Sequence, residues 1–305
     1  MNWFLIALVG PLLYAMTNHI DKILLEKYFK ESGVGTIMLF SSLLSIFAIP
    51  FFLFADPLVL NVSIQNIFIL AAVGILNVLV LWFYLLALNE EEASITIVFY
   101  QLVPVLGSIL GYFLLHEKLS HIQLIAMAIV IFGTTIISFE LDAENKFKLR
   151  TKTIVFMLLA STFWALESVI FKLVALEENV WRSLFWEHVM MGIVGILIFT
   201  FIRSYRINFL KALQFNSVKV LSINACNEIL SIIGNVVFAY AYLLAPIALV
   251  LLVDSFQPIW VLVIGIILTV FFPKISSERI SSKHLTQKII AIVITGIGTY
   301  MLLNF

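Results

Sequence analysis

The stretch YAMTNHIDK at residues 14–22 decides the fold, because a related stretch, WALESVIFK, follows at residues 164–172. Both lie inside apolar runs of helix length. A second correspondence joins Ala87–Pro104 to Ala241–Pro258, 154 positions later. Many secondary transporters are built from such duplicated hydrophobic segments, with the substrate site between the repeats near the bilayer midplane. The sequence therefore predicts a carrier made of two repeats.

Composition places the chain in a membrane. Hydrophobic residues make up 62% of the chain and charged residues 12%, whereas a soluble domain is nearer half apolar and a quarter charged. The expected partners are the lipid bilayer and a small-molecule substrate, in a cell membrane of the bacterial inner or plasma type. The formal net charge of zero offers no basic surface for nucleic acid. The oligomeric state is left open, a monomer included.

The residues of common catalytic and cofactor sites are missing from the sequence. We find no glycine-rich phosphate loop, no paired cysteines and no nucleophile elbow. His116 and His121 are five apart, so they do not share a helix face as zinc ligands would. The lone Cys226 is expected to pack as a small apolar residue. We therefore predict no catalytic residue, no metal, no cofactor and no enzyme.

Ten apolar segments are long enough, at roughly 20 residues, to span a bilayer as helices. The first of them lacks a basic start and a cleavage site, so we expect it to be retained. Five helices in each half is an odd number, so the second half enters the membrane from the opposite side. The predicted fold is an all-α integral membrane protein, with ten transmembrane helices as two inverted five-helix repeats around a central cavity, divided at residues 1–145 and 146–305. The predicted spans are 3–20, 34–54, 67–88, 93–115, 122–139, 153–175, 181–203, 220–244, 247–272 and 289–304.

Polar breaks separate these spans. They are predicted at 21–32, 55–66, 89–92, 116–121, 140–152 and 273–288. Of the 18 Lys and Arg residues, the loops on the side away from the termini hold 15. By the positive-inside rule this distribution puts the termini outside the cytoplasm.

The chain resembles the EamA-type transporters of the drug/metabolite transporter superfamily over essentially its whole length. The first helix of each repeat carries an aromatic-small pair eight residues before a lysine, at 14–22 and 164–172. The fourth helix carries Pro104, and in the second copy Pro258. A Glu-x-Leu-Ser or related turn follows at 117–120 and 278–281, and a glycine-containing helix comes after it.

This resemblance implies a ten-helix basket with a central cavity, and small organic solutes such as amino acids, metabolites or drugs as cargo. Members of the family usually have cytoplasmic termini, the opposite of what the basic residues indicate. The related small multidrug carriers keep a glutamate where this chain has Tyr14 and Trp164, so their proton-coupling carboxylate is not carried over.

The eighth predicted span holds a polar stripe. Its five members have the spacing i, i+3, i+4, i+7 and i+11, which places them on one helix face. Such a face either lines a cavity or hydrogen-bonds a neighbouring helix. An acid at membrane depth favours the cavity. The stripe consists of Asn224, Asn227, Glu228, Ser231 and Asn235.

Other polar and aromatic residues occupy matched places in the two repeats. The first span offers Tyr14, Asn18 and Asp21. The sixth offers Trp164, Glu167, Ser168 and Phe171 on one face. Aromatic faces beside carboxylates suit a cationic or zwitterionic amine. A pairing of Glu167 with a lysine in its own helix is the structural alternative.

The fourth and ninth spans each contain a proline, which permits a bend. We predict Pro104 and Pro258 as hinges, with a purely structural role as the alternative. Asp254 in the ninth span is a candidate proton carrier.

Three further groups are interpreted as structural. Lys22 and Lys172 lie towards helix ends and are expected to reach the headgroups. The segment 181–188 is expected to anchor the seventh span at the interface, with a Glu187–His188 proton relay as the alternative. The acidic run 90–92 is expected to form a solvated turn.

The sequence thus predicts a secondary transporter, expected to export small polar organic solutes such as amino acids, amines or other metabolites by alternating access, with proton coupling as an option. The alternatives are an integral membrane enzyme acting on lipid or prenyl substrates and a non-transporting scaffold. The predicted substrate-binding residues are Tyr14, Asn18, Asn77, Tyr84, Tyr100, Trp164, Glu167, Asn224, Asn227, Glu228, Ser231, Asp254 and Gln257.

Overall fold

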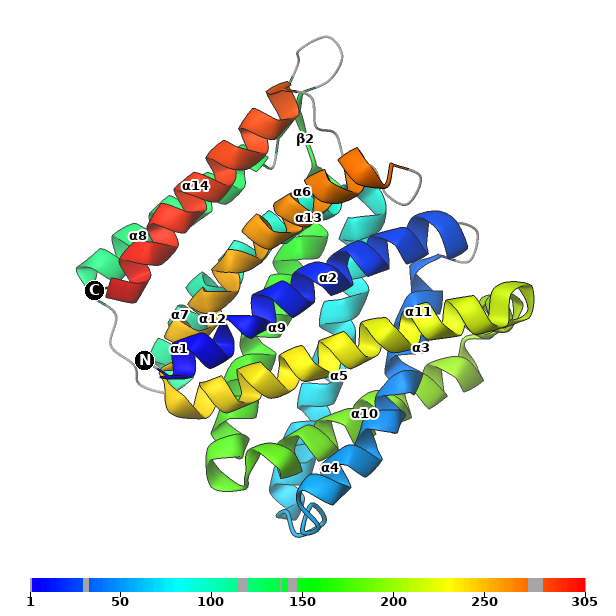
Figure 1. Ribbon diagram of the computed structural model, residues 1–305. Helices are drawn as coiled ribbons and strands as arrows, with labels where there is room; N and C mark the ends of the chain where they lie inside the picture. Colours follow the sequence, from blue (N-terminus) through cyan, green and yellow to red (C-terminus); the bar gives the residue numbers. More distant parts are fainter. Residues whose placement is uncertain are drawn as a thin grey trace.

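The chain folds into a bundle of long helices in a computed structural model that describes residues 2–29, 33–114, 120–137, 139–141, 147–273 and 282–304 (Figure 1). One short antiparallel hairpin, β1 (Phe139–Leu141) with β2 (Phe147–Leu149), joins the halves. The first half contains α1 (Asn2–Ala7), α2 (Val9–Ile23), the π-helical turn η1 (Leu24–Tyr28), α3 (Val34–Leu44), the 3-10 turn η2 (Ser45–Ala48), α4 (Ile49–Ala55), α5 (Ile64–Glu90), α6 (Ala93–Thr96), the 3-10 turn η3 (Ile97–Gln101), α7 (Leu102–Leu114) and α8 (His121–Ile137). The second contains α9 (Thr151–Glu177), α10 (Val180–Phe201), α11 (Arg203–Leu244), α12 (Ile247–Val253), the 3-10 turn η4 (Asp254–Phe256), α13 (Gln257–Phe271) and α14 (Ser282–Asn304).

Within the described residues, eight helical segments are long and apolar enough to cross a membrane. The sequence predicted ten, and this count is not confirmed. In α8 the apolar stretch covers only Leu124–Gly133, and α14 carries several polar residues in its first two turns. These two helices lie side by side at one edge of the bundle (Figure 1). The eight segments are Phe4–Tyr28, Val34–Ala55, Ile64–Glu90, Ala93–Leu114, Thr151–Glu177, Val180–Phe201, Val218–Leu244 and Val250–Phe271.

Several predicted breaks begin too early, because polar residues continue the helices. The break at 21–32 is helical as far as Tyr28. Asp21 is buried and accepts a hydrogen bond from Asn227 on α11, so its polarity does not end the helix. Likewise, the polar segment before the eighth span forms the first turns of the 42-residue α11. The Glu-x-Leu-Ser turns and His116 lie largely or wholly outside the described residues.

Helices of the two halves contact one another in matched pairs. The first helix of one half packs on the third helix of the other, as α2 on α11 and as α9 on α5. The first and fourth helices are paired in the same way, as α2 with α13 and as α9 with α7. Both sets place α2 and α9, which carry the related stretches of sequence, in equivalent surroundings.

The fourth and ninth spans are interrupted at equivalent places. In each, a short 3-10 turn separates two α-helical pieces, and a proline lies in the first turn of the second piece: Pro104 in α7 and Pro258 in α13. Proline fits there because the first turn of a helix needs no N–H donor. The two broken spans pack together, with α6 on α13, η3 on η4 and α7 on α12.

Lys22 and Lys172, the lysines of the two related stretches, have the same structural role. Lys22 donates to the carbonyl oxygens of Leu88 (2.8 Å) and Glu91 (2.6 Å), at the end of α5. Lys172 donates to the carbonyl oxygen of Ala245 (2.8 Å), at the end of α11. An ammonium group satisfies the last carbonyls of a helix and complements its dipole. The expectation that Lys172 reaches the headgroups is wrong, because the residue is buried.

Asp56 and Glu178, two carboxylates just after α4 and α9, hold neighbouring segments together through hydrogen bonds. The Leu58 backbone N–H, 2.8 Å from Asp56 Oδ1, and the Arg182 guanidinium, 3.0 Å from Oδ2, hold the pKa of Asp56 below its ordinary value. The Asn66 amide lowers the pKa of Glu178 in the same way, at 2.8 Å. Since these pKa values are lowered on folding, the stabilisation is present at neutral pH and is lost as the pH falls through them.

The acidic run Glu90–Glu92 is ion-paired, and of its three side chains only that of Glu90, at 40% exposed, is solvated as expected. Its three carboxylates pair in order with Lys152 (3.2 Å), Arg150 (3.1 Å) and Lys288. The first two bases lie around the start of α9 and the third lies in α14. The run therefore ties the end of α5 to two other helices.

Arg150 and Lys152 provide a matched test of this cluster, because only 3% of the Arg150 side chain is exposed but 71% of the Lys152 side chain is. Replacing Arg150 with Ala leaves Glu91 without its buried partner and is expected to lower the free energy of unfolding by about 3–5 kcal/mol. Lys152→Ala removes an exposed pair and should cost less than about 1 kcal/mol. Thermal or denaturant unfolding in detergent measures both, and equal effects would contradict the assigned burial.

Gly74 allows α5 and α10 to approach closely. A Cβ atom there would lie 2.7 Å from the backbone oxygen of Glu187, and backbone cannot move aside as a side chain can. By contrast, a Cβ at Gly296 in α14 would meet nothing within 4 Å. Small residues at such crossings let the helices of membrane proteins pack tightly.

We expect Gly74→Ala to lower the free energy of unfolding by about 1–3 kcal/mol through overpacking. The control Gly296→Ala should be neutral or slightly stabilising, because alanine favours helix more than glycine does. Unfolding midpoints of the purified variants test this difference. A Gly74→Ala protein as stable as the parent would show that the helices do not meet there.

Candidate functional site

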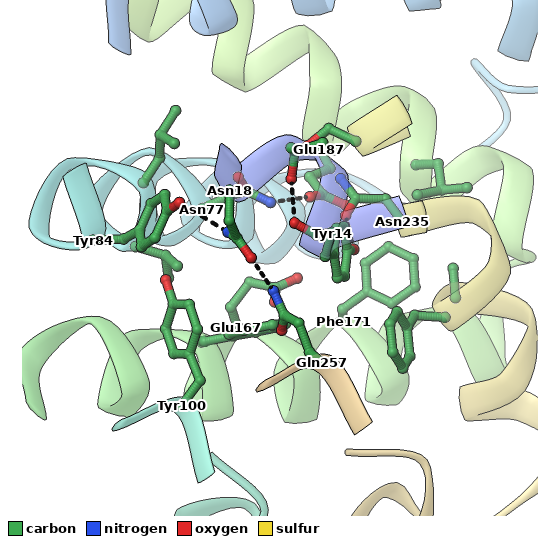
Figure 2. A pocket seen from close by; sticks show the side chains of 18 of the residues that line it. Tyr14, Asn18, Asn77, Tyr84, Tyr100, Glu167, Phe171, Glu187, Asn235 and Gln257 are labelled. Atoms are coloured by element: carbon green, nitrogen blue, oxygen red, sulfur yellow. Dashed lines mark hydrogen bonds between the residues drawn. The ribbon is translucent and has the colours of Figure 1, made fainter. Parts of the chain in front are cut away.

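A cavity of about 140 Å³ lies in the middle of the bundle, between helices of both halves (Figure 2). The first half contributes α2, α5 and η3, and the second contributes α9, α10, α11 and α13. The cavity is lined by Tyr14, Thr17, Asn18, Asp21, Asn77, Val80, Leu81, Tyr84, Tyr100, Trp164, Glu167, Phe171, Leu184, Glu187, Ser231, Asn235, Phe238, Ala239, Tyr242 and Gln257.

The cavity brings together nine of the thirteen residues that the sequence singled out. They come from six different elements, so only the tertiary fold places them side by side. Asn224, Asn227, Glu228 and Asp254 are not part of the lining. The nine are Tyr14, Asn18, Asn77, Tyr84, Tyr100, Trp164, Glu167, Ser231 and Gln257.

A chain of hydrogen bonds runs along one wall of the cavity. Gln257 Nε2 donates to Asn18 Oδ1 (2.6 Å), and Asn18 Nδ2 donates to the Tyr84 hydroxyl (2.8 Å) (Figure 2). The Tyr84 hydroxyl in turn hydrogen-bonds to Asp21, whose Oδ1 also accepts from Asn227 Nδ2 at 2.7 Å. All five residues are buried. The chain thereby links α13, α2, α5 and α11 around the cavity.

Asp254 lies directly behind this chain. It is buried in η4, beside Gln257. Turning the Gln257 amide over would bring its nitrogen to 3.0 and 3.3 Å from the two Asp254 carboxylate oxygens. The position of an amide nitrogen is assigned from its surroundings, and here both Asn18 and Asp254 compete for it. Asp254 is therefore separated from the cavity by a single side chain.

Two glutamates face the cavity from α9 and α10. Glu167 Oε2 accepts from the Ser168 hydroxyl at 3.2 Å, and Glu187 Oε1 accepts from Asn77 Nδ2 at 2.9 Å. The two carboxylates are close enough to interact electrostatically. Both residues are buried, so each carboxylate depends on neutral hydrogen-bond donors.

The expectation that Glu187 anchors the membrane interface is wrong, because Glu187 lies in the cavity lining. His188 lies elsewhere: its Nδ1 is 2.8 Å from the carbonyl oxygen of Leu184, and its ring packs 4.9 Å from that of Phe52. Consecutive residues of a helix point about 100° apart. The Glu187–His188 relay considered from the sequence therefore has no direct contact to support it.

Aromatic rings form a continuous wall of the cavity. The rings of Tyr100 and Trp164 meet edge to face with centroids 4.7 Å apart. Tyr84 stacks on Tyr100 at 5.8 Å, and Tyr14 stacks on Phe238 at 5.6 Å. A further edge contact of 6.1 Å joins Tyr14 to Trp164. The wall presents several π faces next to the carboxylates.

With this geometry in place, comparison with known proteins identifies the first part of the chain. Residues 1–139 match the model of the EamA-like transporter family. The resemblance inferred from the sequence is confirmed there. The family match and the eight apolar helices together support a multi-pass transmembrane transporter of the drug/metabolite transporter superfamily.

Solved structures also match the chain. One of 27 matching chains comes from a crystal structure described only as that of a protein. It is 14% identical, covers 95% of both chains and gives a TM-score of 0.52. At this identity the likeness concerns the fold alone. No curated protein matches the chain.

The polar stripe of α11 divides between two environments. Ser231 and Asn235 line the cavity, and Asn227 reaches it through Asp21. Asn224 Nδ2 donates to a carbonyl oxygen one turn back in α11, at 2.8 Å. The stripe therefore serves as cavity lining at one end and makes helix contacts at the other.

Glu228 lies on the other side of α11. It hydrogen-bonds to Ser41 on α3 and is the one acid of an otherwise apolar groove of about 370 Å³. The groove is lined by residues of α3, η2, α4 and α11, including the exposed Phe47 and Phe51. Cys226, expected to be packed, is exposed on the same helix.

Several cavity residues escaped the candidate set drawn from the sequence. Asp21 and Asn235 lie on the helix faces that were expected to line the cavity, so their spacing in the sequence could have identified them. Tyr242 was not identified, although its hydroxyl lies 3.1 Å from that of Ser168. Phe171 was predicted to share a helix face with Trp164 and Glu167, and it does line the cavity. Phe238 looks like an ordinary apolar helix residue in the sequence, and only the packing of the helices shows that it faces the cavity.

The Tyr84 hydroxyl is the link that we expect to matter most for the stability of the wall. Tyr84→Phe leaves the Asn18 amide and the Asp21 carboxylate each short of a buried partner, which costs about 1–3 kcal/mol. Tyr112→Phe is the control, because that side chain is 48% exposed and should tolerate the change. Unfolding midpoints in detergent distinguish them. Equal stability of both variants would count against the hydrogen-bonded chain.

Proposed function

We propose that this chain is a secondary transporter that carries small polar organic solutes, such as amino acids, amines or other metabolites, by alternating access. The observation that carries the proposal is the central cavity. It is buried in a multi-pass bundle, is built by both halves, and combines carboxylates, amides and aromatic faces. A few convergent polar groups in an otherwise apolar pocket are typical of small-molecule sites.

We further propose that the bundle consists of two inverted repeats of five helices, residues 1–145 and 146–305. The matched contacts of α2 with α11 and of α9 with α5 support this division, as do the paired 3-10 turns η3 and η4. In such carriers, one repeat rocks against the other around a fixed site. Pro104 and Pro258, next to the interrupted segments, are the proposed hinges.

Proton coupling is the proposed source of energy for outward transport across the plasma membrane. Its support is the presence of Glu167, Glu187 and Asp21 in the cavity lining, because intramembrane acids are the usual members of proton relays. The outward direction rests on the family resemblance. A lipid-acting enzyme is less well supported, since the acids gather around one deep cavity rather than at an interface.

Transport in proteoliposomes tests the proposal. With a pH gradient across the membrane, we expect flux of at least one amine or amino acid. We expect Glu167→Gln and Glu187→Gln each to lower this flux by about tenfold or more, since each removes a charge that faces the cargo. Glu26→Gln is the control, because Glu26 lies in the middle of η1, pairs with Lys22 (3.4 Å) and is not part of the cavity lining.

No flux of any tested solute by the folded parent protein would contradict the transport function. Unchanged flux in both cavity variants would contradict the assigned site. Flux that is equal with and without the pH gradient would contradict proton coupling, but neither the transport function nor the assigned site.

A further inference from the structure

The charges that face the central cavity are all negative. Among its twenty described lining residues, Asp21, Glu167 and Glu187 carry carboxylates, and none is lysine, arginine or histidine. The hydrogen bonds to these three acids come from amide and hydroxyl groups. No ion pair within the described chain involves them. The cavity therefore offers acidic groups that no base of the described chain pairs with.

The lysines nearest in sequence do not supply that base. Lys22 follows Asp21 directly, but its ammonium group bonds the carbonyl oxygens at the end of α5 and pairs with Glu26. Lys172 follows a lining phenylalanine, but its ammonium group bonds the carbonyl oxygen of Ala245. Neither lysine is part of the cavity lining. Both ammonium groups donate to carbonyl oxygens at the ends of helices, outside the cavity lining.

The aromatic wall adds a second attraction for cations. The rings of Tyr100 and Trp164 meet at right angles, and Tyr14 contacts Trp164 from another side. An ammonium group over the face of a Trp or Tyr ring is attracted by the ring quadrupole, more strongly where water is excluded. Carboxylates and π faces thus converge on the same small volume.

An amino acid would bring its own carboxylate into this volume. Three of the four lining amides already donate: Asn77 to Glu187, Asn18 to Tyr84, and Gln257 to Asn18. The fourth, Asn235, accepts from the Tyr14 hydroxyl through Oδ1. A bound carboxylate would meet three carboxylic acids with no base opposite, and it would be repelled by each of them that is ionised, strongly so in a poorly solvated site. An amine that lacks a carboxylate avoids this repulsion.

We propose that the central cavity selects organic ammonium ions without a carboxylate over the corresponding amino acids. This selectivity rests on the transport function proposed above and narrows its substrate class. Asp21, Glu167 and Glu187 bind the ammonium group, and the aromatic wall packs against the carbon skeleton.

Amines and the amino acids from which they differ by one carboxyl group give a matched test. Binding of phenethylamine and phenylalanine, and of cadaverine and lysine, is measured on the purified full-length protein in detergent. Transport of the same four solutes is measured in proteoliposomes. We expect each amine to bind about tenfold or more tightly than its amino acid, and to be transported in preference. Glu167→Gln should weaken amine binding, while Glu26→Gln should leave it unchanged.

The outcomes separate this inference from the broader function. Transport of the amino acids in preference to the amines would overturn the inference and leave the transport function standing. No binding and no flux of any of the four would overturn the inference, and a wider solute screen would then decide the function. If a glutamine variant does not fold, the amine-to-amino-acid ratio of the parent protein still decides the question.

Discussion

The structure depends on how a membrane bundle accommodates buried carboxylates. Acids at membrane depth are costly, and they persist where they face the bundle interior and find partners. Asp21, Glu167 and Glu187 meet this requirement with neutral donors, among them Asn227, Ser168 and Asn77. Neutral donors satisfy the lone pairs but leave the charge uncompensated. A bound proton or a bound cation completes such a site.

The two halves share a frame but differ in the chemistry of the site. Lys22 and Lys172 hold the ends of the third helix of their own halves, so this contact is the same in both. At the cavity the correspondence ends. Tyr100 occupies in the first half the place that Asp254 has in the second. The matched helix contacts and the two proposed proline hinges are therefore symmetric, while the side chains that line the cavity are not. Such a lining can bind an asymmetric solute.

The sequence could predict the features that depend on period and hydrophobicity. The apolar runs predicted ten spans, of which eight correspond to long apolar helices among the described residues. The stripe spacing put Ser231 and Asn235 on one face. It could not predict which polar residues end a helix, because burial and a partner from another helix decide that, as Asn227 does for Asp21. It also misjudged Glu187, since distance from a helix start does not reveal what the facing helix offers.

The acidic run Glu90–Glu92 is a second case in which partners from other helices could not be predicted from the sequence. Three consecutive acids look like a solvated turn, yet Arg150 and Lys288 are brought to them by the arrangement of α9 and α14. This cluster also joins the cavity, through α2. Asp21 faces the cavity, and the next residue, Lys22, bonds the Glu91 carbonyl oxygen. Because neighbouring helix positions point in different directions, one turn of α2 connects the wall that faces the cargo to the ion pairs that hold the helix ends.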